Sequence, residues 1–435
     1  MVLPGNLSLS MMLRTFLLLG AFAAWHSAVN AQTRPTSGVE HFILHSFGGP
    51  DGAGPLLGVI ADAKGAFYGT TAFGGKAADG TIFKLTLSKS GYNETVLHNF
   101  SGGSEGDAPD GLVGGNGGVL YGGTLAGGQN GCGVGCGTVF KLTPKNSGYA
   151  FSVVYRFRPG SDANQPVGNP VVDKNGAIYG VTQLGGSSNN GAVFKLTPGK
   201  SGYTERVLYS FPGGVGGTLP QAGLTIDTGG SLYGTTYYGG TGSCGGGCGT
   251  VFKLTAIKSG YSHKVLYSFR NDSDGVAPSA ALTVDESTGA IFGTTEYGGA
   301  DFYGTVFKLT PSGSDYIESI VYEFNGSADG GYPEGQLLLA TNGVLFGTTA
   351  RGPGSKYLKG LGTVFQLTPS GSSYAFKLIY GFLRPSAGSD PLWSTLISDG
   401  KGALYGTTRS GGSKLNCNDG GETNGCGTVF KLILN

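Results

Sequence analysis

Carboxylates in Gly-rich loops are the side chains of this 435-residue chain that are best suited to chemistry. Two carboxylates can cleave a glycosidic bond when one donates a proton and the other acts as base or nucleophile. The sequence does not select one pair among the loop carboxylates, so we assign no catalytic residue. The candidates are Asp107, Asp110, Asp274, Glu296, Asp301, Asp329 and Glu334.

Histidine-dependent hydrolysis is disfavoured by the positions of the histidines. None of the five histidines falls in the long loops that vary between repeats. Ser-His-Asp or Cys-His catalysis on those loops would require one. His45 and His98 stand where other copies of a recurring Leu-Tyr-Ser-Phe segment have Tyr, so we interpret both as scaffold residues.

Six cysteines lie in three loops, with two cysteines in each loop. An even number of cysteines in an exported protein is typical of disulfides. A zinc site is the alternative, but each loop supplies two thiolates and no His, fewer than a four-ligand shell needs. We therefore expect disulfides within each loop, and no metal or cofactor. The pairs are Cys132 with Cys136, Cys244 with Cys248, and Cys417 with Cys426.

Aspartates recur in turns together with Gly or Pro. Both Asp and Gly favour turns for local conformational reasons, so we interpret these aspartates as structural. Residues 271–275 (Asn-Asp-Ser-Asp-Gly) resemble the start of a calcium loop but lack the distal Glu at the required spacing, which leaves calcium binding as the less favoured alternative. The turn residues are Asp51, Asp107, Asp162, Asp274, Asp329 and Asp390.

The elements that position these residues belong to an internal repeat. A segment like Leu-Tyr-Gly-Thr-Thr occurs seven times, with successive glycines 53 to 59 residues apart. A segment like Gly-Thr-Val-Phe-Lys-Leu follows each copy, a segment like Leu-Tyr-Ser-Phe comes next, and a weaker fourth segment precedes each copy. The glycines of the seven copies are Gly69, Gly122, Gly180, Gly234, Gly293, Gly347 and Gly406.

The recurring segments have the composition of β-strands. They are short, rich in Val, Ile, Tyr, Phe and Thr, and bounded by Gly, Pro, Asn or Ser. Four such strands in a repeat of about 56 residues match one blade of a propeller. We therefore predict an all-β fold, a seven-bladed β-propeller with four antiparallel strands per blade.

The ends of the repeat region predict a closed ring. Residues 42–47 form a segment of the Leu-Tyr-Ser-Phe type without the three strands that usually precede it, and residues 429–432 lack the strand that usually follows. We expect the N-terminal strand to join the last blade and to close a propeller over residues 39–435. An open stack would leave sheet edges that need caps, and no cap is apparent.

The order of these segments resembles the Gloeo/Verruco tandem repeat of exported bacterial proteins, also described as choice-of-anchor repeat proteins. The resemblance covers essentially residues 39–435 and is carried by the whole unit, which recurs seven times. It implies export and a repeat architecture, and it supplies no catalytic residues.

One face of the predicted propeller is suited to binding. The loops between blades share it with the loops between the Tyr-Gly and Val-Phe strands, and their length and composition vary while the scaffold repeats. Aromatic side chains there could stack on sugar rings, or could only pack the loops together. The candidate ligand residues are Phe73, Asp107, Tyr238, Asp274, Tyr297, Tyr303, Asp329 and Tyr357.

Residues 1–31 are typical of a signal peptide. Arg14 precedes an apolar run over residues 15–25, and residues 29–31 (Val-Asn-Ala) offer a cleavage site. The run is shorter than the roughly 20 residues of a membrane-spanning helix, so we expect no span in the mature chain. Residues 32–38 would form a short linker, and the protein would be secreted or periplasmic.

The balance of charge limits the partners. The 28 basic and 27 acidic side chains leave no net field to recruit nucleic acid. We expect a monomeric binding or interaction module whose partner is a polysaccharide or a cell-surface protein. The alternatives are a carbohydrate-active hydrolase or lyase with paired carboxylates near the channel mouth, and a structural envelope protein.

Overall fold

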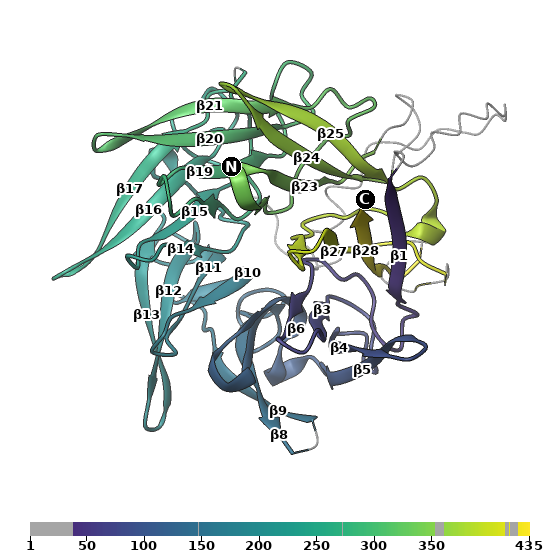
Figure 1. Ribbon diagram of the computed structural model, residues 1–435. Coiled ribbons are helices and arrows are strands. Elements are labelled where there is room, and N and C mark those ends of the chain that lie inside the picture. The colour runs from purple at the N-terminus through teal and green to yellow at the C-terminus, as the bar shows by residue number, and fades with distance from the viewer. Residues whose placement is uncertain (1–37, 147, 272, 353–360, 414–416, 418–424) are drawn as a thin grey trace, which may run out of the picture.

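The computed structural model describes residues 38–146, 148–271, 273–352, 361–413, 417 and 425–435. The predicted signal peptide and most of the predicted linker lie outside this range. Within it, seven four-stranded antiparallel sheets surround a central axis (Figure 1). The predicted seven-bladed β-propeller is therefore confirmed. No helix in the described part of the chain is long and apolar enough to cross a membrane.

The first three blades, numbered in chain order, contain strands of two to ten residues. Blade 1 consists of β2 (Ile60–Ala61), β3 (Phe67–Thr71), β4 (Thr81–Ser88) and β5 (Gly91–Asn99). Blade 2 consists of β6 (Asp107–Gly114), β7 (Leu120–Ala126), β8 (Thr138–Lys145) and β9 (Gly148–Arg156). Blade 3 consists of β10 (Ala163–Val172), β11 (Ile178–Gly185), β12 (Ala192–Gly199) and β13 (Gly202–Ser210).

The next three blades repeat this order. Blade 4 consists of β14 (Thr225–Ile226), β15 (Leu232–Thr236), β16 (Thr250–Ile257) and β17 (Gly260–Ser268). Blade 5 consists of β18 (Thr283–Val284), β19 (Ile291–Thr295), β20 (Thr305–Ser312) and β21 (Asp315–Glu323). Blade 6 consists of β22 (Leu338–Leu339), β23 (Leu345–Thr349), β24 (Thr363–Ser370) and β25 (Ser373–Gly381).

Blade 7 combines the two ends of the described chain. It consists of β26 (Ile397–Ser398), β27 (Ala403–Thr408), β28 (Thr428–Leu434) and β1 (Val39–Ser46). The connections include five short 3-10 turns, η1 (Gly103–Glu105), η2 (Asn116–Gly118), η3 (Gly214–Gly216), η4 (Thr341–Gly343) and η5 (Pro385–Ala387).

A glycine facing a phenylalanine explains the recurring sequence of the inner strands. Gly69 on β3 lies opposite Phe83 on β4, and a Cβ atom at this glycine would lie 2.6 Å from the ring. The same pairing recurs in all seven blades. The glycine therefore makes room for a ring that fills the interior of each blade.

Phenylalanines also hold neighbouring blades together. The Phe that follows the outermost strand of one blade meets the β4-type Phe of the next blade edge-to-face, as Phe47 meets Phe83 with ring centroids 5.0 Å apart. All seven seams contain this contact, with centroids 4.9 to 5.3 Å apart. Edge-to-face pairs stabilise a core beyond the area they bury. The seam between blades 7 and 1 is packed like the six others.

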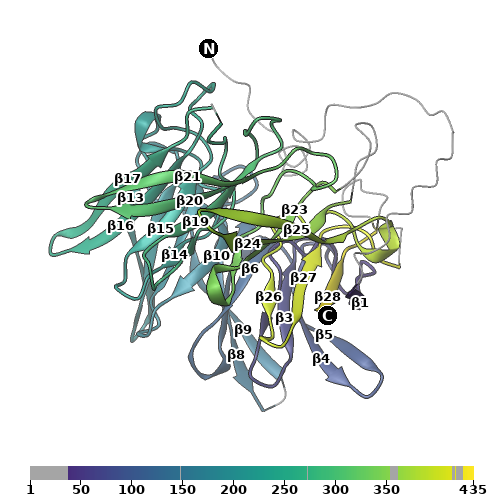
Figure 2. The same ribbon diagram turned by 45° about the horizontal axis from the view of Figure 1, so that its top comes forward.

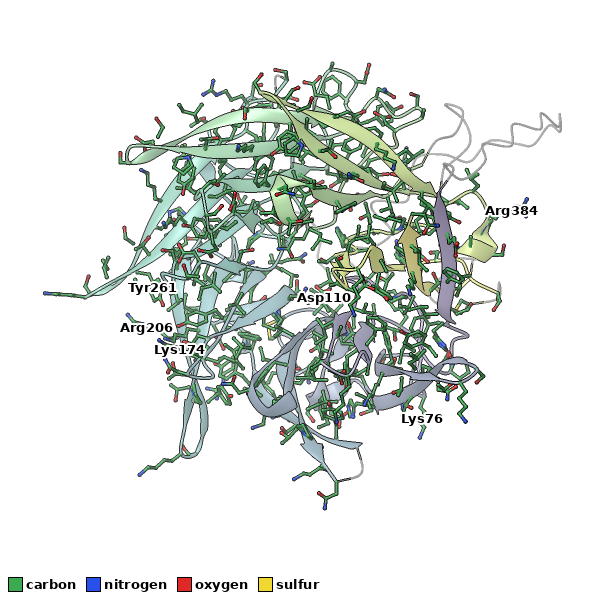
Figure 3. All side chains as sticks on the ribbon, viewed as in Figure 1. Lys76, Asp110, Lys174, Arg206, Tyr261 and Arg384 are labelled. Carbon is green, nitrogen blue, oxygen red and sulfur yellow. A yellow bond between two sulfur atoms is a disulfide. The ribbon has the colours of Figure 1, made fainter. Side chains whose placement is uncertain are left out.

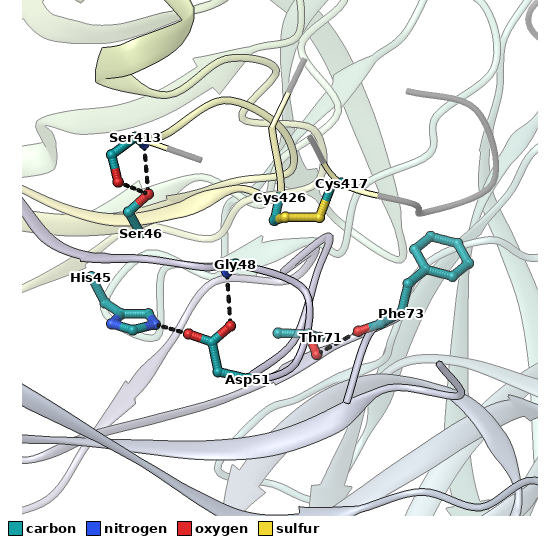
Figure 4. The surroundings of a disulfide bond; sticks show 9 residues. All are labelled: His45, Ser46, Gly48, Asp51, Thr71, Phe73, Ser413, Cys417 and Cys426. Carbon is teal, nitrogen blue, oxygen red and sulfur yellow. Dashed lines mark hydrogen bonds and ion pairs between the residues drawn. A yellow bond between two sulfur atoms is a disulfide. The ribbon is translucent and has the colours of Figure 1, made fainter. Parts of the chain in front are cut away.

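The predicted closure by the N-terminal strand is confirmed. Strand β1 pairs antiparallel with β28, from Val39 opposite Leu434 to Ser46 opposite Thr428. Figure 2 shows β1 next to β28 at the edge of the last sheet. In the close-up, the Ser413 backbone N–H donates to the Ser46 hydroxyl at 2.7 Å, beside the last disulfide (Figure 4). Backbone pairing thus joins the two ends without a covalent bond between them.

Candidate functional site

Short segments of all seven blades meet around a cavity of about 860 Å³ on the propeller axis, with two segments from each blade except blade 4, which contributes one. One segment lies at the end of the second strand of a blade or just after it. The other surrounds a proline that lies before the first strand or, in blades 2 and 3, within it. Asp110, which lines the cavity, lies near the centre of the ring in Figure 3, whereas Lys76 and Arg384 lie at its periphery. A cavity of this volume is the usual size for a small-molecule site.

The residue before this proline adopts a left-handed backbone in every blade. Tyr332 has φ of 57° and Asp390 has φ of 59°, where a non-glycine residue is strained. The Tyr332 N–H donates to the carbonyl of Tyr303, and the Tyr332 carbonyl accepts from the Ala350 N–H at 3.0 Å. These bonds hold the strained residue in place at the channel mouth. The six non-glycine residues are Ala108, Gln165, Leu219, Ala277, Tyr332 and Asp390.

The cavity wall is mostly uncharged on one side, where apolar side chains and amides alternate with a single carboxylate, and charged on the other. Blades 1 to 4 contribute mostly aliphatic and aromatic side chains, among them Leu56, Leu57, Phe73, Leu125, Val167, Leu184, Leu219 and Leu224. Blades 5 to 7 contribute Glu296, Tyr297, Tyr332, Glu334, Arg351, Asp390, Trp393 and Arg409. A ligand in this channel would therefore meet two chemically different walls.

Glu296 and Glu334 are the acidic centre of the charged wall. The Tyr237 hydroxyl donates to the Glu296 carboxylate at 3.0 Å. Burial raises the pKa of Glu296, and the hydrogen bonds from Tyr297 and Tyr237 oppose that rise. Burial holds the pKa of Glu334 well above its usual range, and the nearby charges of Glu296 and Asp390 add to it. Burial and the neighbouring carboxylates therefore disfavour the ionised form of Glu334.

The two arginines of this wall have partners of their own. The Arg409 guanidinium lies 3.7 Å from the Asp390 carboxylate. The Arg351 guanidinium lies over the Tyr332 ring, 4.6 Å from its centroid. Both cations lower the pKa of Glu334, but burial and the neighbouring carboxylates outweigh them.

Two further polar side chains line the cavity. The Asp110 carboxylate accepts from the Gly168 N–H at 2.9 Å, and burial raises the pKa of Asp110 to about 6. Ser279 is only 3% exposed, and its hydroxyl has no hydrogen-bond partner among the described residues. An unpaired buried hydroxyl costs free energy, so a ligand that supplied the missing bond would gain from it.

Chemically, the charged wall could hold a ligand or could transfer protons. Two neighbouring carboxyl groups, one of them with a strongly raised pKa, can act as the acid and base of a glycoside hydrolase. In the described part of the chain, no group of three His, Cys, Asp or Glu side chains is arranged to hold a metal ion.

The sequence-predicted ligand residues separate into distinct places. Phe73 and Tyr297 line the cavity. Tyr238 is exposed on the rim, with its ring 4.8 Å from that of buried Tyr237. Tyr303 packs against Tyr332 with ring centroids 5.6 Å apart. Tyr357 lies outside the described residues.

Asp274 and Asp329 are bonded within their own turns. The Tyr267 hydroxyl donates to Asp274 at 2.7 Å, and the Tyr322 hydroxyl donates to Asp329 at 3.0 Å. Each carboxylate also accepts a backbone N–H of the same turn. The contacts give both aspartates a structural role, and their role in ligand binding stays a prediction.

The predicted set of acidic turns needs a correction. In the turn between blades 1 and 2, the position equivalent to Asp51 is occupied by Glu105, which accepts from the Ser101 hydroxyl, whereas Asp107 begins β6. Asp390 is the left-handed residue before Pro391 and pairs with Arg409. Asp107 and Asp390 therefore do not occupy the position of Asp51, because Gly-rich loops of unequal length carry no periodic signal that aligns them.

Of the acidic candidates for catalysis, the structure brings together Glu296 and Glu334. Asp110 lines the same cavity from blade 2, and Asp301 is exposed in the loop after β19. Sequence reasoning missed several other lining residues, although all occupy one of the two repeat-aligned segments: Gln165, Asn169, Gln183, Gln221, Tyr332, Gln336, Arg351, Trp393 and Arg409. Alignment of the seven copies at these segments would have found them.

The three predicted disulfides are confirmed. Cys132 pairs with Cys136, Cys244 with Cys248, and Cys417 with Cys426, with Cα atoms 5.0, 5.1 and 5.3 Å apart. They cross-link the loops that follow β7, β15 and β27 in blades 2, 4 and 7.

The fold and the axial cavity define a seven-bladed propeller with one ligand-sized channel on its axis. The chain belongs to the Gloeobacter/Verrucomicrobia repeat family, whose model matches residues 32–247 and 245–418. The predicted resemblance is therefore confirmed. A search of curated proteins gives no match.

Solved structures share the fold at low sequence identity. The extracellular domain of a putative one-component system from B. thetaiotaomicron superposes with a TM-score of 0.54 at 10% identity, over 90% of this chain and 40% of that one. A fungal alcohol oxidase in complex with copper gives 0.53 at 12% identity, over 90% and 75%. A putative 6-phosphogluconolactonase from Bacteroides uniformis gives 0.50 at 13% identity, over 81% and 89%. This chain therefore spans less than half the length of the B. thetaiotaomicron protein. At such low sequence identity, the similarities show the fold alone.

Proposed function

We propose that this chain is an exported propeller that binds a saccharide, as part of a polysaccharide or of a cell-surface glycan, at the mouth of its axial channel. The observation that carries the proposal is the cavity of about 860 Å³, in which side chains vary on a repeated scaffold. Five amide side chains line it, and an amide can both donate to and accept from a sugar hydroxyl. They are Gln165, Asn169, Gln183, Gln221 and Gln336.

Aromatic rings support the same ligand class. Phe73, Tyr297 and Trp393 line the cavity from blades 1, 5 and 7. Their faces are large, rigid and apolar, which suits stacking against the C–H face of a sugar ring. Amides for the hydroxyls and rings for the C–H faces together match a saccharide better than a wholly apolar ligand.

Export is supported by the disulfides and by the leader-like sequence. The three disulfides require an oxidising compartment, which secreted and periplasmic proteins meet. We propose that residues 1–31 are a signal peptide, that residues 32–38 link it to the propeller, and that the mature chain is secreted or periplasmic.

A glycan array tests the proposal, followed by titration of the strongest ligand. Ala350 lines the channel, so Ala350→Trp is expected to weaken binding by about tenfold or more because it fills part of the cavity. The control is Lys76→Ala, at the periphery in Figure 3, which is expected to bind like the unmodified chain. No binding to any glycan, or equal binding by both variants, would contradict the proposed site.

A carbohydrate hydrolase is the second candidate function, and the pairing of Glu296 with Glu334 favours it. Glu334 would protonate the leaving oxygen, while Glu296 would act as base or nucleophile. Incubating the bound glycans and measuring newly released reducing ends tests this candidate. Glu334→Gln is expected to abolish release and to keep binding, and absence of release from every bound glycan would exclude it.

A further inference from the structure

The cavity holds more carboxylates than cations. Four acidic side chains line it, Asp110, Glu296, Glu334 and Asp390, against two basic ones, Arg351 and Arg409. Arg409 is neutralised by Asp390 at 3.7 Å, and Arg351 lies on the Tyr332 ring. Glu334 also feels the charges of both arginines, but neither Glu296 nor Glu334 forms an ion pair among the described residues.

The contacts of the two glutamates show what is missing. Glu296 accepts hydrogen bonds from the phenols of Tyr237 and Tyr297, and no cationic side chain of the described chain pairs with it. No described residue forms a hydrogen bond with the Glu334 carboxyl group, which faces Glu296, Asp390, Arg351 and Arg409 and is near Tyr297. Two carboxyl groups in this position repel one another when both are ionised.

Ser279 supplies a second and independent observation. It occupies the same position after a proline in blade 5 that Glu334 occupies in blade 6, and both line the cavity. Its hydroxyl is buried and has no partner among the described residues. A buried hydroxyl group without a partner points to a group that the ligand provides.

We propose that the wall formed by Ser279, Glu296 and Glu334 binds a primary ammonium group, so that the saccharide ligand is an amino sugar with a free amine. An ammonium group has three N–H donors and no acceptor, and this wall offers two carboxylates and one hydroxyl oxygen. This inference rests on the proposed saccharide function for the sugar part of the ligand, whereas the ammonium site is argued from Ser279, Glu296 and Glu334. A uronate would instead place a third carboxylate against the pair.

Binding of an ammonium group must be linked to a proton. Burial raises the pKa of Glu334 in the free wall, and a bound cation lowers it by favouring the ionised form. Binding then releases a proton from Glu334, so affinity rises with pH while Glu334 titrates and the amine stays charged. A neutral sugar would bind without this release. The measured enthalpy of binding therefore depends on the ionisation enthalpy of the buffer only for the amine.

The test is calorimetric titration of the full chain with four probes: a glucosamine tetramer with free amines, its N-acetylated form, a glucose tetramer, and propylamine. The free-amine tetramer is expected to bind about tenfold or more tightly than either neutral tetramer, because hydrogen bonds to charged groups are the strong ones. Among the three tetramers, only the free-amine tetramer is expected to release a proton from Glu334 when it binds.

Three variants locate the effect. Glu334→Gln is expected to lower the affinity for the free-amine tetramer by about tenfold and to abolish proton release. Ser279→Ala is expected to lower the same affinity by about fivefold without changing the proton release. The matched control is Glu40→Gln, the same substitution at an exposed glutamate of β1 that does not line the cavity. That variant is expected to bind within about twofold of the unmodified chain.

The outcomes separate this inference from the proposed function. Equal binding of neutral and free-amine tetramers overturns the ammonium site and leaves saccharide binding standing. Binding of propylamine without any saccharide supports the ammonium site and overturns the saccharide proposal. Absence of binding by all four probes overturns the inference. Competition by Ca²⁺ at equal concentration would also overturn it, because the wall would then be a metal site.

Discussion

Glutamates at the outer seams show how single side chains set the pH response. Glu94 on β5 and Glu205 on β13 each have one buried carboxylate oxygen without a hydrogen-bond partner among the described residues. In blades 2 and 6 the same position holds Phe151 and Phe376, which stack on aromatic rings of the preceding blade. Burial raises the pKa of Glu94 to about 7, which the charge of His45 opposes and that of Asp51 supports. A charged Glu94 thus destabilises its seam.

Glu94→Gln is expected to stabilise the protein in a pH-dependent way. Because the folded state holds the proton of Glu94 up to about pH 7 and the unfolded chain loses it near 4.5, stability falls as pH rises between these values. Since the side chain of Glu94 is only partly buried, the gain at pH 8 should be on the order of 1 kcal/mol, with little change at pH 4. Urea unfolding at both pH values measures this difference.

Glu40→Gln is the control for this prediction. Glu40 is exposed on β1, so its replacement is expected to have the same small effect at both pH values. Equal effects of Glu94→Gln at pH 4 and pH 8 would show that the carboxyl group of Glu94 is not held protonated.

At the scale of the elements, neighbouring blades are in contact through a glycine before the third strand of one blade and a proline near the first strand of the next. Gly427, before β28, has φ of 95°, and a Cβ atom there would lie 2.5 Å from Cδ of Pro55. Gly80, before β4, makes the same approach to Pro109 at 2.5 Å. Blade 7 therefore meets blade 1 through the contact that joins blades 1 and 2.

Gly427→Ala and Gly80→Ala are expected to destabilise the protein equally, by about 3 kcal/mol, through left-handed strain and the clash with proline. Gly160→Ala separates the two causes, because Gly160 has φ of 101° and nothing within 4 Å of an added Cβ. It should cost only the strain, about 1 to 2 kcal/mol. Thermal unfolding of the three variants tests this, and a Gly427→Ala variant as stable as Gly160→Ala would show that the closing seam is loosely packed.

At the scale of the whole molecule, the ring depends on backbone pairing between distant parts of the chain. The Asn435 N–H donates to the Gly38 carbonyl at 2.8 Å, next to the β1–β28 pair. The break in the ring falls where other blades have the turn between their third and fourth strands, as β12 and β13 have at Gly202. Moving the break to another blade should therefore preserve every seam.

A circular permutant tests this equivalence. It joins Asn435 to Gly38 by a short Gly-Ser linker and opens the exposed turn before Gly202 in blade 3. It is expected to keep the strand content and to unfold within a few degrees of the unpermuted propeller, because exposed turns tolerate new ends. Loss of cooperative unfolding would indicate that the closure by β1 is specific to blade 7.

Much of this architecture could be predicted because its causes are local and repeated. Gly69 and Phe83 belong to segments that recur with fixed spacing, and the incomplete repeats at residues 42–47 and 429–432 imply closure. The cysteine pairs are close in sequence, so their partners followed from proximity. The sequence could not align Asp107 and Asp390 with the other turn aspartates, because glycine-rich turns have no hydrophobic period to fix their alignment.

The sequence by itself determined the blade, the number of blades and the strand that closes them, since β-pairing follows from the residue pattern along each segment. Only the tertiary structure decided that Glu296 and Glu334 meet on one charged wall while blades 1 to 4 form a mostly uncharged one. Contacts across the axis join residues of different blades, and their distances depend on how seven sheets pack around the ring. No periodicity within one segment encodes that packing.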